Sequence, residues 1–181
     1  IIALAPLAAY AATHAGDVGT RTSTVSAFGG VAGTRQVSLA ESALRHGLMF
    51  WVWGDRNGRH NLVGTPELDP VTGALAIVGA SALLASRGTR GRGVWLLAWI
   101  GIGLLAGIAS TPSEAPNAHR TIAVVPAVLL LGAAGLDRLG SKASSALTPF
   151  ANEKVTARAA GLVVATTCGL GAILGASRFL T

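Results

Sequence analysis

Charged residues are scarce in this sequence. Asp, Glu, Lys and Arg make up 12% of its 181 residues, against about 25% in a typical soluble domain. Hydrophobic residues make up 51%, and the mean hydropathy is +0.56. The single cysteine, Cys168, lies in an apolar run, which excludes an internal disulfide and gives no metal-ligand spacing. The composition therefore excludes an ordinary soluble domain and indicates an integral membrane protein or a part of one.

The few charges that are present are mostly basic. Lys and Arg number 14 and Asp and Glu number 8, which gives a net charge of +6 and a pI near 11.1. Long apolar runs separate the basic residues, so they form no patch of the kind that binds nucleic acid, and we expect no nucleic-acid partner. The sequence has no initiator Met, and no basic region precedes its first apolar stretch. We therefore expect the interior or late part of a longer membrane protein.

Four apolar runs lie within 68–177 and predict four transmembrane helices. Asp69 and Pro70 precede the first run and suit an N-cap and a first helical position. Pro126 lies inside the third run, where neighbouring groups in a membrane protein can satisfy the carbonyl that it leaves free. With 1–13 as a partial first span of about 20 Å, the predicted fold is a single all-α transmembrane bundle over 1–181. The runs are 71–86, 93–113, 121–136 and 159–177, and GxxxG pairs, a weak signal of helix contact, occur at Gly103 and Gly107 and at Gly171 and Gly175.

Residues 14–67 are predicted to form a long outer loop that contains one interfacial helix. Gly, Ser and Thr are frequent in 14–36, which is typical of a loop. Apolar residues then recur every three or four positions and predict an amphipathic helix. Two interpretations of this helix stand equally: it lies in the membrane interface, or it packs against its own protein. The recurring residues are Val37, Ala40, Leu44, Leu48 and Trp51, and Glu41 and Arg45 form a favourable i, i+4 pair on the polar side.

The basic residues also predict the orientation of the chain in the plasma membrane. The loops after the first and third runs are rich in Lys and Arg, whereas 111–119, between them along the chain, contains neither. Because short cytoplasmic loops carry an excess of Lys and Arg, both basic loops are predicted to be cytoplasmic, and loops 14–67 and 111–120 extracytoplasmic. The basic loops hold Arg87, Arg90 and Arg92 in one case, and Arg138, Lys142, Lys154 and Arg158 in the other.

The most polar run, 54–68, is predicted to be a shaped loop because its glycines and proline forbid a long helix. A second polar cluster, 114–120, stands just before the third apolar run. Arginine and histidine donors at the water–lipid boundary, beside a helix N-terminus, suit the phosphate or pyrophosphate of a lipid. The primary candidates for such contacts are Arg59, His60, Asn61, His119 and Arg120, and the secondary candidates are Asp55, Arg56 and Asn117.

Other chemistry has weaker support in these clusters. Interfacial arginines also contact ordinary phospholipid headgroups, and this interpretation stays open. No spacing of His, Asp and Glu predicts a metal site. Asp55 and Glu67 are both conceivable catalytic bases, but no spacing selects either of them. We therefore predict no metal site and no cofactor in this segment, and we assign no catalytic residue.

Residues 50–70 resemble a segment of polytopic glycosyltransferases of the GT-C type. These include the protein O-mannosyltransferases of family 39 and the aminoarabinose transferases that modify lipid A. In such proteins a Gly-Asp-x-Asn-x-Arg-His-Asn-x-Pro-Gly-x-Pro-x-Leu loop leads into a membrane helix. The sequence matches this loop over 54–68, except that Val63 stands where the pattern has proline. A later outer loop and a helix with an internal proline resemble 116–120 and Pro126, so that the resemblance covers 35–139.

The resemblance implies an enzyme that transfers a sugar from a polyprenyl-phosphate donor to a lipid, glycan or protein acceptor on the extracytoplasmic face. It also implies that the essential carboxylate, and any dependence on a divalent metal, belong to an earlier outer loop that this sequence does not contain. The present segment would supply scaffold and lipid-phosphate contacts. The alternative is a non-enzymatic membrane subunit or a transporter segment, although transport usually requires charged residues in the middle of a span and none is present.

Overall fold

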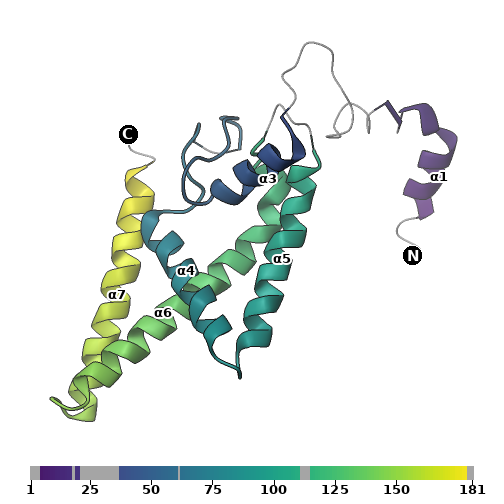
Figure 1. Ribbon diagram of the computed structural model, residues 1–181. Coiled ribbons are helices and arrows are strands. Elements are labelled where there is room, and N and C mark those ends of the chain that lie inside the picture. The colour runs from purple at the N-terminus through teal and green to yellow at the C-terminus, as the bar shows by residue number, and fades with distance from the viewer. Residues whose placement is uncertain (1–4, 18, 21–36, 61, 111–114, 179–181) are drawn as a thin grey trace.

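The computed structural model describes residues 5–17, 19–20, 37–60, 62–110 and 115–178, and all regular structure in these residues is helical (Figure 1). The all-α prediction is therefore confirmed. Residues 15–17 and 19–20 are helical, contrary to the predicted loop over 14–36, and 21–36 lies outside the described residues. The helices are α1 (Ala5–Thr13), α3 (Leu39–Leu48), α4 (Pro70–Ala85), α5 (Arg90–Ile108), the 3-10 helix η3 (His119–Val124), α6 (Val125–Leu147) and α7 (Glu153–Ser177).

Among the described residues, three segments are long and apolar enough to cross a membrane: α5, the continuous stretch His119–Leu147 formed by η3 and α6, and α7. The chain thus has the helices of a membrane protein. The first apolar run forms α4, which has 16 residues and rises only about 24 Å against a hydrocarbon core of about 30 Å. Four full spans are therefore not confirmed. Asp69 and Pro70 begin α4 as predicted, since the Asp69 carboxylate accepts the N–H groups of Val71 and Thr72.

The most extensive contact between the described helices joins α4 to α6, which cross in the centre of the bundle (Figure 1). Gly79 of α4 lies against the Leu131 carbonyl oxygen so closely that a Cβ atom would overlap it, and Gly135 of α6 lies in the same way against Leu75. Backbone-to-backbone contact of this kind requires small residues in both helices. The buried apolar residues packed around this crossing and below α3 are Met49, Phe50, Ala76, Leu96, Val124, Ala127, Val128 and Leu131.

The start of the α6 segment differs from the uniform helix that the third run suggests. Residues 119–124 form the 3-10 helix η3, and Pro126 lies in the first turn of α6, not within its interior. Proline fits a first turn because its missing N–H has no partner there. One turn back, the Ala123 carbonyl oxygen accepts the indole N–H of Trp99 from α5 at 2.9 Å. The carbonyl oxygen four residues before Pro126, that of Ile122, accepts the backbone N–H of Val125. The expectation for an interior proline, that a neighbouring group satisfies a freed carbonyl, therefore does not apply at this position.

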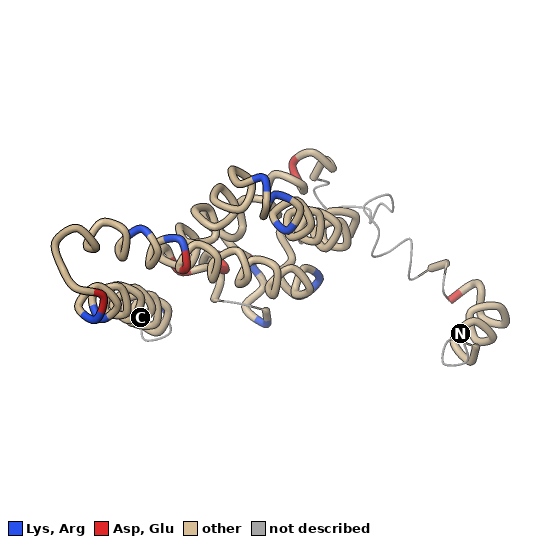
Figure 2. The backbone as a smooth tube through the Cα atoms, turned by 90° about the horizontal axis from the view of Figure 1, so that it is seen from below, with Lys and Arg blue, Asp and Glu red and all other residues tan. Residues whose placement is uncertain are grey.

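Apart from Arg120, the basic residues of 87–158 belong to the α4–α5 turn, the first turn of α5, the C-terminal half of α6 and the first turns of α7, at the end of the bundle opposite α3 (Figure 2). The predicted basic loop over 138–158 is wrong in its extent, because α6 continues to Leu147 and α7 begins at Glu153. Arg138 and Lys142 are therefore helical residues of α6, and Lys154 and Arg158 belong to α7. The predicted assignment of this end to the cytoplasm, and of the α3 end to the outside, stays a prediction.

The helix α3 buries two polar residues and exposes part of the predicted apolar stripe, since Ala40 and Leu44 are exposed whereas Val37 is buried. Ser42 and His46 are buried, whereas Leu39 and Leu44 expose 44% and 59% of their surface. The Ser42 hydroxyl donates to the Ile108 carbonyl oxygen at 3.2 Å, which joins α3 to the C-terminal end of α5. The packing of α3 against its own protein is therefore confirmed on the side of Ser42 and His46. Its position in the membrane interface stays a prediction.

Candidate functional site

The polar run 54–68 forms a closed loop at the α3 end of the bundle. The N–H of Gly54 donates to the Gly64 carbonyl oxygen at 3.2 Å, and the N–H of Gly64 donates to the Asp55 carbonyl oxygen at 2.8 Å. A Cβ atom at Gly54 would overlap the Thr65 carbonyl, and Gly64 has a φ of 72°, in the region that favours glycine. The predicted shaped loop is therefore confirmed, and two of its glycines have identifiable roles.

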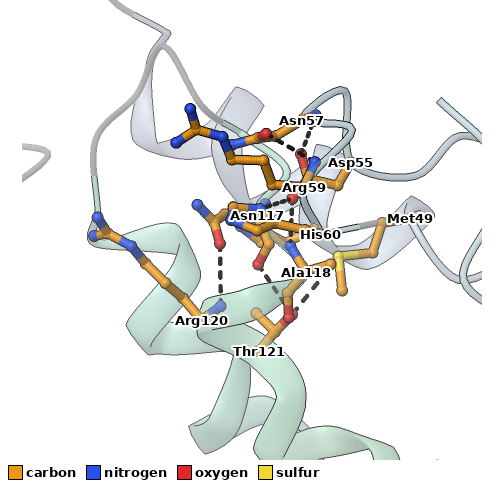
Figure 3. Close-up of polar contacts among 10 residues, drawn as sticks. Met49, Asp55, Asn57, Arg59, His60, Asn117, Ala118, Arg120 and Thr121 are labelled. Carbon is orange, nitrogen blue, oxygen red and sulfur yellow. Dashed lines mark hydrogen bonds and ion pairs between the residues drawn. The ribbon is translucent and has the colours of Figure 1, made fainter. Parts of the chain in front are cut away.

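Asp55 is the acceptor that organises the loop (Figure 3). It is 2% exposed, and its Oδ1 accepts the Asn57 N–H at 2.7 Å. Its Oδ2 accepts the Nδ1–H of His60 at 2.8 Å and the N–H of Ala118 at 2.9 Å. A carboxylate accepts but does not donate, so these contacts place the His60 proton on Nδ1 and leave Nε2 as the second functional atom of the ring. Asp55 therefore joins the two polar clusters that lie 63 positions apart in the sequence.

His46, which the sequence gives little reason to select, links α3 to the 114–120 cluster. It is completely buried. Its Nδ1–H donates to the Ser42 carbonyl oxygen at 2.8 Å, and its Nε2 accepts the N–H of Asn117 at 3.1 Å. Gly107 makes room for the ring, since a Cβ atom there would stand 2.6 Å from Nε2. Arg45, paired with Glu41 as predicted, adds a hydrogen bond from Nη1 to the Ala115 carbonyl oxygen at 3.2 Å.

The buried His46 should make the protein less stable in mild acid. Burial lowers the pKa of His46, although its hydrogen bond to the Ser42 carbonyl and the negative charge of Asp55 act in the opposite direction. Below the ordinary histidine pKa of 6.5, the unfolded chain binds a proton that the folded chain does not, so the free energy of unfolding decreases as pH falls. We expect the melting temperature of His46→Gln to change less than that of the parent between a neutral and a mildly acidic buffer.

Thermal unfolding at the two pH values measures this difference. His14→Gln is the control, because His14 is exposed directly after α1 and its variant should follow the parent. Equal acid-induced losses of melting temperature in the parent and in His46→Gln would show that His46 is not the group responsible.

A cavity of about 490 Å³ opens between the 54–68 loop, the N-terminal end of α4 and the η3–α6 segment. Three primary candidates, Arg59, His60 and His119, line it together. The rings of His60 and His119 stack with their centroids 5.4 Å apart. The polar lining also includes Glu67 and Asp69, and the apolar lining consists of Met49, Phe50, Leu68, Ile122, Val125, Val128 and Leu129.

The acidic side of this cavity is tied to the C-terminal end of α7. The Arg178 guanidinium donates from Nη1 to the carbonyl oxygens of Pro66 and Leu68, at 3.0 and 2.9 Å. Burial raises the pKa of Asp69, but hydrogen bonds from Thr72 and Val71, helped by the charge of Arg178, outweigh this effect and hold the pKa below its ordinary value. Asp69 is therefore an ionised cap of α4 at neutral pH. Nothing in the local pattern around Arg178 indicates this contact.

The other sequence candidates lie outside the cavity lining. Arg56 is exposed on the loop. Asn117 is 3% exposed, and its Oδ1 accepts the Arg120 N–H at 3.1 Å, so it shapes the start of η3. The Arg120 guanidinium extends away from Asp55 and His60 in Figure 3. Asn61 lies outside the described residues.

Comparisons with known proteins identify no relative, so a function for this cavity has to be argued from its geometry. No protein-family model, curated protein or solved structure matches this chain. Among the described residues, no three His, Cys, Asp or Glu side chains are arranged to hold a metal ion. The arrangement instead offers one arginine and two histidines, beside the carboxylates of Glu67 and Asp69, in a cavity with an extended apolar lining. Such a site can bind an anion that carries a hydrocarbon chain.

Proposed function

We propose that this cavity binds the phosphate of a lipid-linked sugar, and that the chain is part of a GT-C-like membrane glycosyltransferase acting on the extracytoplasmic face. The observation that carries the proposal is the convergence of Arg59, His60 and His119 on one cavity that continues along apolar side chains. A soluble phosphate has no use for the apolar part, and an uncharged lipid has none for the arginine. A phosphate attached to a polyprenyl chain uses both.

The head of the ligand is assigned to the basic residues. Arg59 supplies planar, paired donors that match phosphate oxygens. His60 is held by Asp55 through its Nδ1–H, and in its doubly protonated form it donates from Nε2 as well. Glu67 and Asp69 repel a phosphate. They are therefore assigned to the side of the cavity that holds the sugar hydroxyls.

The hydrocarbon tail of the ligand is assigned to one exposed row of apolar side chains on η3 and α6. Ile122, Val125 and Leu129 line the cavity at three- and four-residue spacing, and they expose 66%, 43% and 52% of their surface. Residues so spaced share one face of a helix. A hydrocarbon chain laid along this row leads from the basic residues toward the middle of the membrane.

In the proposed reaction, an acceptor hydroxyl oxygen attacks the anomeric carbon and the bond from that carbon to the phosphate oxygen breaks. Negative charge then grows on the departing lipid phosphate, where fixed donors stabilise it more than they stabilise the bound donor. Asp55 already accepts three hydrogen bonds in a buried position, so the base that takes the hydroxyl proton is assigned to the longer protein. The alternative, a non-enzymatic subunit, would keep the binding site without the turnover.

Arg59→Ala is expected to weaken binding of a short-chain polyprenyl phosphate by about tenfold to a hundredfold, which is the usual loss when a hydrogen bond to a charged group is removed. His119→Ala should act in the same direction. Arg56→Ala is the matched control, because Arg56 lies in the same loop but not in the cavity lining. Arg120→Ala should also have a small effect. Titration of the purified protein in detergent by isothermal calorimetry measures the affinities.

Three comparisons separate this proposal from its alternatives. The corresponding polyprenol, which has no phosphate, should bind at least tenfold more weakly if Arg59 contacts phosphate. Equal losses in Arg56→Ala and Arg59→Ala would indicate general attraction of an anion to a basic surface. Displacement of the polyprenyl phosphate by phosphatidylglycerol at equal concentration would assign the cavity to ordinary phospholipid.

A further inference from the structure

Two further cavities lie at the opposite end of the bundle, beside the turn between α4 and α5. The larger, of about 480 Å³, is lined by the start of α5 together with α4 and α6. The smaller, of about 390 Å³, is lined by the end of α4, the turn and α6. Leu83 and Ala134 line both, so the two cavities share a wall where α4 meets α6. Neither contains a residue of the outer site proposed above.

Each of these cavities has one arginine in its lining, Arg92 in the larger and Arg138 in the smaller. Both side chains are exposed, and among the described residues neither makes a hydrogen bond or an ion pair. Asp137, which lines the smaller cavity, is the one carboxylate in 82–92 and 130–147. Figure 2 shows basic residues on the α4–α5 turn and on the C-terminal half of α6. The other basic residues of these segments are Arg87, Arg90 and Lys142.

The larger cavity continues from its arginine along apolar side chains. Trp95, Leu96 and Leu130 line it, and Trp95 exposes 59% of its surface. Along α5, Leu96 lies one helical turn beyond Arg92, or about 6 Å further toward the middle of the membrane. Tryptophan at such a depth is typical of the boundary between headgroups and acyl chains. An anion beside Arg92 can therefore carry hydrocarbon chains that lie against Trp95 and Leu130.

We propose that these two cavities form a binding site for an anionic glycerophospholipid of the leaflet at this end of the bundle. The phosphodiester lies at the rim that carries Arg92 and Arg138, and the acyl chains lie against Trp95, Leu96 and Leu130. A zwitterionic phospholipid carries the same phosphodiester, but its own ammonium group offsets that charge beside the arginines, and free phosphate leaves the apolar lining unfilled. Basic pockets between membrane helices bind anionic headgroups for the same reasons. The site does not depend on the function of the outer cavity.

Native mass spectrometry of the full chain in detergent, with phosphatidylglycerol and phosphatidylcholine of identical acyl chains in equal amounts, tests the proposal. We expect phosphatidylglycerol to be retained over phosphatidylcholine by about tenfold. The double variant R92Q/R138Q should bring this ratio close to one. The matched control is K154Q/R158Q, which removes the same charge at the start of α7, outside both cavities, and it should keep the ratio of the parent.

The outcomes are distinct. Equal falls in the two double variants would overturn the site, because they would show attraction to the net charge alone. Equal retention of the two lipids by the parent would also overturn it, as would displacement of phosphatidylglycerol by excess inorganic phosphate. Because the side chains of Arg92 and Arg138 are exposed and make no hydrogen bond or ion pair with the described residues, their replacement should leave thermal unfolding unchanged. If the double variant does not fold, the single variants R92Q and R138Q carry the test.

Discussion

Asp55→Ala is expected to destabilise the α3 end of the protein and to abolish binding of polyprenyl phosphate in the outer cavity. The substitution leaves the N–H groups of Asn57 and Ala118 and the Nδ1–H of His60 without their acceptor. Buried donors left unsatisfied cost about 1–3 kcal/mol each, and partial access to water reduces this, so we expect a loss of about 3 kcal/mol in the free energy of unfolding. His60 also loses the contact that fixes its proton and its orientation, so the phosphate site should fail as well.

Denaturant titration of the purified protein, followed by ligand titration of whatever remains folded, measures both effects. Asp55→Asn should fall between the parent and Asp55→Ala, because the amide oxygen still accepts while the amide nitrogen faces donors. Asp137→Ala is the control: it removes a carboxylate that is exposed and unbonded in the described chain, and it should change stability by less than about 0.5 kcal/mol. Unchanged binding in Asp55→Ala would show that His60 needs no carboxylate to act.

The loop at 54–68 shows what local chemistry predicts well. Gly54 and Gly64 stand where only glycine fits, and a dense set of glycine, proline and polar residues indicates such a loop without any knowledge of the fold. The same reasoning selects Arg59, His60 and His119, because it asks only which donors stand at the membrane boundary. The same reasoning also groups Arg120 with these three residues, although Arg120 lies outside the cavity lining. The direction of the Arg120 side chain depends on how η3 begins, and the hydrogen bond from the Arg120 N–H to Asn117, which residue spacing does not reveal, shapes that start.

His46 and α3 show what local chemistry does not predict. An apolar stripe at helical spacing predicts the buried face of a helix only when the surroundings are water. In α3 the buried face carries Ser42 and His46, whose partners at Ile108 and Asn117 lie more than 60 positions away. The spacing of Ser42 and His46, four apart on the polar side, is the one available signal. It becomes informative once the leucines are assigned to the membrane side.

The α4–α6 crossing gives the second large expected effect: Gly79→Ala and Gly135→Ala should each destabilise the protein by about 3 kcal/mol or more. The added methyl group meets a backbone carbonyl oxygen in each case, Leu131 for Gly79 and Leu75 for Gly135, and a backbone cannot move aside as a side chain can. The helices must then separate, and the packing of Ala76, Val128 and Leu131 around the crossing is lost.

The matched controls are the same substitution at glycines with open surroundings. Gly101 in α5 and Gly161 in α7 have no atom within 4 Å of an added Cβ, and alanine favours a helix over glycine by about 1 kcal/mol. Gly101→Ala and Gly161→Ala should therefore be neutral or stabilising in the same denaturant titration. If all four variants unfold alike, the close crossing of α4 and α6 is wrong.

The double variant G79A/G135A distinguishes a shared contact from two separate ones. Both glycines belong to the same crossing, since an added Cβ on Gly79 also lies 2.7 Å from the Gly135 nitrogen. Once the first methyl group has forced the helices apart, the second enters space that is already open, so the combined loss should be clearly smaller than the sum. The sequence offers GxxxG pairs at Gly103 and Gly107 and at Gly171 and Gly175, but neither Gly79 nor Gly135 belongs to them. Which glycines meet is decided by the angle at which two helices cross, and that angle follows from packing over the whole of both helices.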